Sequence, residues 1–140
     1  MNFNLVYPMA AMVLLTFFML VAMFRRRVRA VKAGEADAGF YKTYQEGKEP
    51  REAAAYSRHV VNMFETPTLF YAACVTAMIT GQTGTAMLVL AWLYVALRSL
   101  HAYIHTGRNR LPSRIKTFFA SLLVLLGMWG TIVVGVAMSG

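Results

Sequence analysis

Three polar residues, Arg58, Asn62 and Glu65, follow one another at spacings of four and three positions in the printed sequence. On a helix this spacing places all three on one face, because 3.6 residues make one turn. A guanidinium, an amide and a carboxylate on one face suit a small molecule that carries carboxylates and an amine. Past Glu65 no charged residue occurs before Arg98, so the carboxylate stands at the mouth of a long uncharged run. A carboxylate in that position needs a partner or a function.

A second polar stripe, Arg98, His101 and His105, has spacings of three and four and again falls on one helical face. If the helices that carry the two stripes are antiparallel, their charged ends meet at the same side and the stripes face each other. The segment that follows adds three further arginines, namely Arg108, Arg110 and Arg114. Together these residues predict a pocket rich in cationic donors with one carboxylate and one amide. Glutathione carries the matching groups.

Each stripe also has a structural interpretation. Glu65 paired with Arg98 or with Arg58 would hold two helices together, since buried charges are usually paired. His101 and His105 have the spacing of a metal-binding pair, but no adjacent Cys or Asp completes a ligand shell. We therefore expect no metal.

The composition excludes an ordinary water-soluble domain. Of the 140 residues 58% are hydrophobic and 14% are charged, which is typical of a membrane protein. A formal charge of +8 would suggest nucleic-acid binding in a soluble protein. Here, however, every Lys and Arg lies in residues 25–58 or 98–116, at the flanks of apolar segments. The basic charge is better explained by membrane topology and anionic lipid headgroups, and no nucleic acid is expected as a partner.

The elements that must position the two stripes are apolar segments of spanning length. The sequence predicts four helices, at residues 5–24, 51–80, 85–105 and 113–138. The fold class is therefore all-α, a four-helix transmembrane bundle that forms one domain over residues 1–140. The first loop, residues 32–51, and the third, residues 106–116, carry the positive charge, so both are expected in the cytoplasm and both termini on the other side. Pro67 is expected to kink the second helix.

These residues resemble the MAPEG family, the membrane-associated proteins of eicosanoid and glutathione metabolism. The resemblance rests on Arg58-x3-Asn62-x2-Glu65 before a proline, on Arg98-x2-His101 near the end of the third span, and on the later Arg114. The segment from Arg98 to Arg114 is most similar to the bacterial branch of the family. The resemblance implies a homotrimer in the bacterial inner membrane, with glutathione bound between adjacent subunits near the cytoplasmic face.

The resemblance also implies roles for individual residues. The helix-2 residues Arg58, Asn62 and Glu65 would bind glutathione, and His101 and His105 would lie against the tripeptide. An arginine at the start of the fourth helix would hold the thiolate, and the matching positions are Arg114 first and Arg110 second. The implied activity is that of a glutathione transferase or peroxidase acting on lipophilic electrophiles or hydroperoxides. The alternative is a non-catalytic membrane protein that binds lipid or a quinone, or serves as an accessory subunit of a larger complex.

Overall fold

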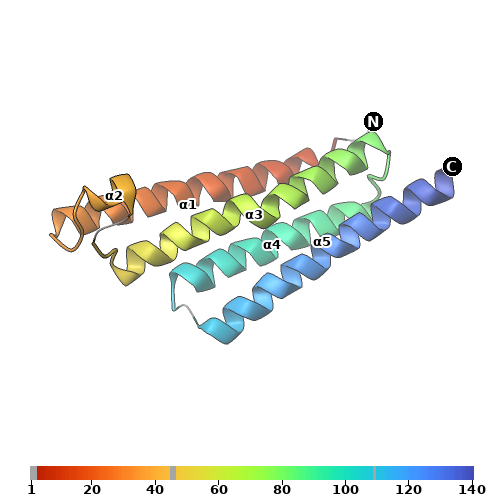
Figure 1. Cartoon of the computed structure of the whole chain (residues 1–140). Coiled ribbons are helices and arrows are strands. Elements are labelled where there is room, and N and C mark those ends of the chain that lie inside the picture. Colours follow the sequence, from red (N-terminus) through yellow and green to blue (C-terminus); the bar gives the residue numbers. More distant parts are fainter. Residues whose placement is uncertain (1–2, 45–46, 109) are drawn as a thin grey trace.

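The chain folds into long helices that lie side by side in the computed structural model (Figure 1). The structure describes residues 3–44, 47–108 and 110–140, and within them it contains helices and no strand. The helices are α1 (Val6–Lys32), α2 (Phe40–Thr43), α3 (Arg51–Ile79), α4 (Thr85–Thr106) and α5 (Leu111–Ser139). Four of them are long, and the four-residue α2 lies in the first loop. The all-α prediction is therefore confirmed.

Consecutive long helices run antiparallel, so the two basic loops lie at the same end of the molecule (Figure 1). Both termini and the turn between α3 and α4 lie at the opposite end. α1 packs mainly against α3, and α4 packs mainly against α5. This arrangement brings the charged ends of α3 and α4 to the same end of the bundle, as the charge pattern predicts.

Three of the helices, α1, α4 and α5, are long and apolar enough to cross a membrane. α3 has 29 residues and is long enough, at about 1.5 Å per residue, to cross as well. Its first half carries Arg58 and Glu65, however, and it is not among the three. That α3 is a fourth span therefore stays a prediction.

The packed interior combines alanine and aliphatic side chains with methionines and one stacked aromatic pair. The rings of Phe70 in α3 and Tyr94 in α4 stack with centroids 4.6 Å apart. Met12 of α1 and Met128 of α5 are fully buried in the same cluster. Pro67 is also buried, and α3 continues through it to Ile79. The predicted kink at this proline stays a prediction.

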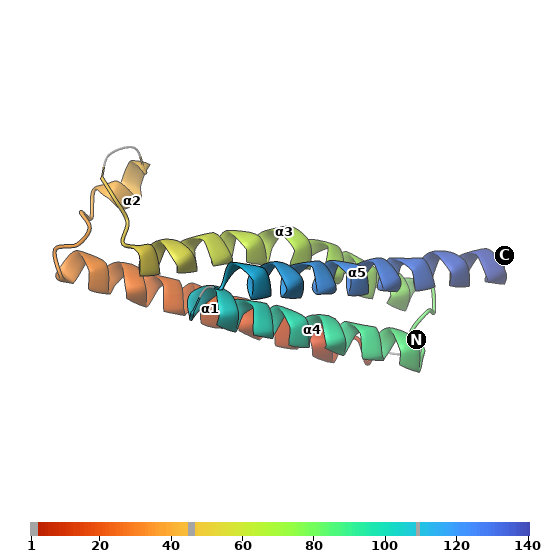
Figure 2. The same cartoon turned by 90° about the horizontal axis from the view of Figure 1, so that it is seen from below.

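Two helix boundaries differ from the predicted ones in ways that matter for function. α1 continues to Lys32, two turns beyond the predicted end of the first span, so its arginines are helical. α5 begins at Leu111, which places Arg114 in its first turn. The first loop contains the short helix α2, which stands off the bundle at the end where α1 finishes (Figure 2).

Candidate functional site

The two polar stripes meet at the buried contact between α3 and α4. The Arg98 side chain has no exposed surface, and its Nη2 donates to the Oδ1 and the backbone carbonyl of Asn62. The predicted convergence of the stripes is therefore present within a single chain, through Asn62 on one helix and Arg98 on the other.

The histidine end of the α4 stripe contacts α5. The Nδ1 atom of His101 lies 3.1 Å from the carbonyl oxygen of Arg114 and 3.2 Å from Oγ1 of Thr117. A hydroxyl and a carbonyl at these distances are both hydrogen-bond partners for an imidazole nitrogen. His105, one turn later, is also buried. The predicted residues Asn62, Arg98, His101 and His105 thus lie together beside the start of α5.

A third histidine, His59, belongs to the same cluster and was missed by the sequence analysis. Its side chain is fully buried, and its ring centroid lies 5.6 Å from that of His101 and 5.1 Å from that of His105. The pattern that identifies it is the apolar periodicity of α3, since Met63 and Phe70 on the same helix are buried too. Extending that periodicity back by four residues from Met63 reaches His59.

The other predicted residues lie outside the buried cluster. Arg58 and Glu65 are exposed at the edges of the buried face of α3, and Arg110 is exposed just before α5. Among the described residues Glu65 forms no ion pair with Arg98 or Arg58, although its charge acts on Arg98 from a greater distance. Ion pairs instead join Arg26 to Glu52 and Arg27 to Glu49, while Arg98 bonds to Asn62. The Glu65 side chain lies on the exposed face of α3, whereas Asn62 lies on the face toward α4 and contacts Arg98.

A cavity of about 220 Å³ opens beside the cluster. Its lining combines polar groups from three helices with aromatic and aliphatic side chains of α5, namely Asn62, His101, His105, Arg114, Ile115, Phe118 and Phe119. The Arg98 guanidinium lies 6.0 Å from the ring centroid of Phe118, in the range of a cation–π contact. Among the lining residues Arg114 gives the cavity a cationic side, and Ile115 and Phe119 give it an apolar side.

Several buried polar atoms of the cluster have no hydrogen-bond partner among the residues that the structure describes. They are Nε and Nη1 of Arg98, both ring nitrogens of His59, Nε2 of His101 and Nδ1 of His105. A buried donor without a partner costs free energy, and native proteins keep few of them. Of these residues His101 and His105 line the cavity, so a polar molecule bound there would supply partners for their ring nitrogens.

The chemistry of the cluster favours an anion over a metal ion. Within residues 3–44, 47–108 and 110–140, no group of three or more His, Cys, Asp or Glu side chains is placed to hold a metal. The two arginines that flank the histidines, Arg98 and Arg114, would repel a cation and attract a carboxylate or a thiolate. The arrangement can therefore bind a small anion and stabilise negative charge on it.

The fold and the site define a helical integral membrane protein with a buried cationic site near one end of its bundle. A sequence profile described as the MAPEG family matches residues 5–134, which is nearly the whole chain. The chain belongs to the MAPEG family. No curated protein and no solved structure matches it.

Proposed function

We propose that the chain binds glutathione at this site and activates the glutathione thiol toward lipophilic electrophiles or hydroperoxides. The observation that carries the proposal is the set of unpartnered ring nitrogens of His101 and His105, which line a cavity together with Arg114, and the unpartnered N–H groups of the adjacent Arg98. A tripeptide with two carboxylates, amide oxygens and N–H groups supplies acceptors for the N–H donors and donors for the unprotonated imidazole nitrogens.

Arg114 is the residue assigned to the thiolate. A free thiol has a pKa of about 8.5 and is only a few per cent ionised at neutral pH. Each unit by which a neighbouring cation lowers this pKa corresponds to about 1.36 kcal/mol of preferential stabilisation of the thiolate. Because Arg114 lies in the first turn of α5, the positive end of the helix dipole adds to its charge. The thiolate then attacks an electrophile that arrives through the bilayer.

A homotrimer would explain why Arg58 and Glu65 are exposed on the single chain. The cavity of about 220 Å³ is smaller than ligand pockets usually are, since those span roughly 300 to 1,000 Å³. A neighbouring subunit that supplies the missing wall would enlarge the site and bring Arg58 and Glu65 within reach of glutathione. We place the site at the cytoplasmic face of a bacterial inner membrane, where the two basic loops would lie and glutathione would be available.

One observation favours the non-catalytic alternative. The hydrogen bond between Arg98 and Asn62 joins α3 to α4 within one chain, which is a packing function that requires no ligand. In this alternative the chain binds a lipid or a quinone, or acts as an accessory subunit of a larger membrane complex. It predicts no turnover of chlorodinitrobenzene with glutathione.

Glutathione is expected to raise the melting temperature of the detergent-solubilised protein. A ligand present at one hundred times its Kd adds about 2.7 kcal/mol to the stability of the folded state. The shift is measured at millimolar glutathione by thermal denaturation. Arg58→Ala and Glu65→Ala are expected to abolish it, whereas Arg51→Ala, a matched change at an exposed position in the first turn of the same helix, should retain it. An unchanged melting temperature of the wild-type protein would refute glutathione binding.

A further inference from the structure

The basic end of α1 holds the first loop in place through one arginine. The Arg27 guanidinium lies 4.9 Å from the ring centroid of Tyr41 and 5.6 Å from that of Tyr44. The same group lies 3.4 Å from a carboxylate oxygen of Glu49 and donates to Oγ of Ser57 at the start of α3. These contacts hold α2 near α1 but leave a hollow between the two helices.

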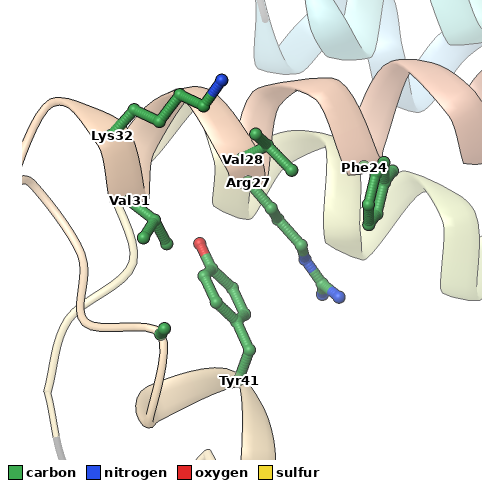
Figure 3. A pocket seen from close by; sticks show the side chains of 7 residues that line it. Phe24, Arg27, Val28, Val31, Lys32 and Tyr41 are labelled. Carbon is green, nitrogen blue, oxygen red and sulfur yellow. The ribbon is translucent and has the colours of Figure 1, made fainter.

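This hollow is a cavity of about 410 Å³ with a mainly apolar lining (Figure 3). Its walls are Phe24, Arg27, Val28, Val31 and Lys32 of α1 together with Ala38 and Tyr41. Phe24 is 65% exposed, so a large aromatic surface at one edge of the cavity has no protein partner. Such a surface is stable when hydrocarbon covers it.

If the first span ends at Phe24, as the hydropathy predicts, the cavity lies at the depth where acyl chains meet headgroups. Phe24 is the last residue of the predicted first span, and Lys32 follows two turns later at the end of α1. Side chains on a helix lean toward its N-terminus, so on α1 the long cationic side chains reach back toward the membrane. A molecule in the cavity would meet apolar side chains on the membrane side and a lysine on the other.

Positive charge without a counterion surrounds the rim of the cavity. A second hollow of about 260 Å³ lies on the adjoining face of α1 and shares Phe24, Val28 and Lys32 with the first. The second hollow is also lined by Arg25 and Arg29, which do not line the first. In the part of the chain that the structure describes, Arg25, Arg29 and Lys32 form no ion pair, whereas Arg27 is neutralised by Glu49. The rim therefore attracts an anionic group.

The Tyr41 hydroxyl supplies a hydrogen-bond donor inside the cavity. It points toward α1 (Figure 3), is buried, and makes no hydrogen bond of good geometry among the described residues, although the Glu49 carboxylate lies near enough to act on it. Burial, and after it the charge of Glu49, raises the pKa of Tyr41 above its ordinary value. The hydroxyl therefore stays protonated and can donate to an ester or phosphate oxygen.

We propose that this cavity binds an anionic phospholipid, with an acyl chain against Phe24, Val28 and Val31 and the phosphate against Lys32. A zwitterionic lipid is a weaker occupant, because its cationic headgroup would face the unpaired arginines and lysine. Free phosphate lacks the acyl chain that covers the apolar wall. The proposal is independent of glutathione binding, since the two cavities share no lining residue.

The test is a titration of the melting temperature of the detergent-solubilised protein with phosphatidylglycerol, with phosphatidylcholine, or with inorganic phosphate. Phosphatidylglycerol is expected to raise it, and the other two are not. Lys32→Gln should weaken the apparent affinity for phosphatidylglycerol about fivefold, the usual effect of one basic residue at an anionic surface. Ala38→Trp, which fills the cavity without changing its charge, should abolish the effect.

Two matched variants serve as controls. Lys116→Gln removes the same charge from exposed surface on α5, and Leu14→Trp adds an indole to an exposed position of α1 away from the cavity. Both should respond to phosphatidylglycerol as the wild type does. The proposal is overturned if phosphatidylcholine or phosphate stabilises equally, or if Lys116→Gln weakens binding as much as Lys32→Gln. It is also overturned if the lipid effect survives in Ala38→Trp. Lys32→Gln removes a charge, whereas Ala38→Trp fills the cavity. If one of the two variants misfolds, the other still tests the proposal.

Discussion

Arg114→Ala is expected to slow the glutathione-dependent conversion of chlorodinitrobenzene about 100-fold or more, the usual cost of removing one group that stabilises a reacting anion. In this reaction the thiolate bonds to the carbon that carries chlorine, and chloride leaves. Arg114 lines the cavity beside His101 and His105. Without its charge the bound thiol should ionise nearer its ordinary pKa, so the loss should shrink as the pH of the assay rises.

The pH profile separates this effect from a general loss of structure. A misfolded variant would lose activity equally at every pH, whereas loss of thiolate stabilisation is recovered in alkaline buffer. Lys116→Ala, an exposed change of the same charge on the same helix, should turn over like the wild type. A larger loss in Arg110→Ala than in Arg114→Ala would reverse the two assignments. Full activity in both variants would contradict the proposal that an arginine at the start of α5 stabilises the thiolate.

The second large effect is expected at the hydrogen-bonded pair formed by the half-buried Asn62 and the buried Arg98. We expect the double variant Asn62→Leu/Arg98→Met to lose the glutathione-induced melting shift entirely while its ligand-free form melts above the wild type. Arg98 is fully buried, has no ion pair among the described residues and leaves two of its nitrogens without a partner. Replacing both partners of such a hydrogen bond by apolar side chains of similar shape can be nearly neutral or stabilising.

The single variant Arg98→Met is the informative comparison. It removes the buried charge but leaves the Asn62 side-chain oxygen without its donor, at a cost of about 1 to 3 kcal/mol, so it should melt below the double variant. Thermal denaturation with and without glutathione measures both quantities. If the double variant instead melts several degrees below the wild type, Arg98 and Asn62 serve packing, and the non-catalytic alternative gains support.

The prediction of the fold depended on features that are local in the chain. Apolar runs of spanning length and the confinement of Lys and Arg to two loops predicted the long helices and the shared end of those loops. The family resemblance, which the profile match over residues 5–134 confirms, depended on motif spacing within two short windows. Neither kind of information requires knowledge of contacts between helices.

The structure brings all the predicted residues of α4 into the buried cluster but only one of those on α3. On α4 all three residues of the stripe are buried, because Arg98, His101 and His105 continue the face that Tyr94 begins. On α3 the chosen stripe lies at the edge of the buried face, so Asn62 is half-buried while Arg58 and Glu65 are exposed. Successive residues on a helix are separated by about 100°. Arg58 therefore lies on the surface, whereas its neighbour His59 lies in the core.

The sequence by itself determined that the chain is an all-helical membrane protein of the MAPEG family with cationic polar stripes at one end, because hydropathy, charge and motif spacing are properties of each segment alone. Only the tertiary structure decided that His59 joins the cluster and that Glu65 has no ion-pair partner in the described chain. It also decided that a lipid-sized hollow lies between α1 and α2. The physical reason is that burial depends on how each helix is rotated against its neighbours, and this rotation follows from side-chain packing between segments distant in sequence.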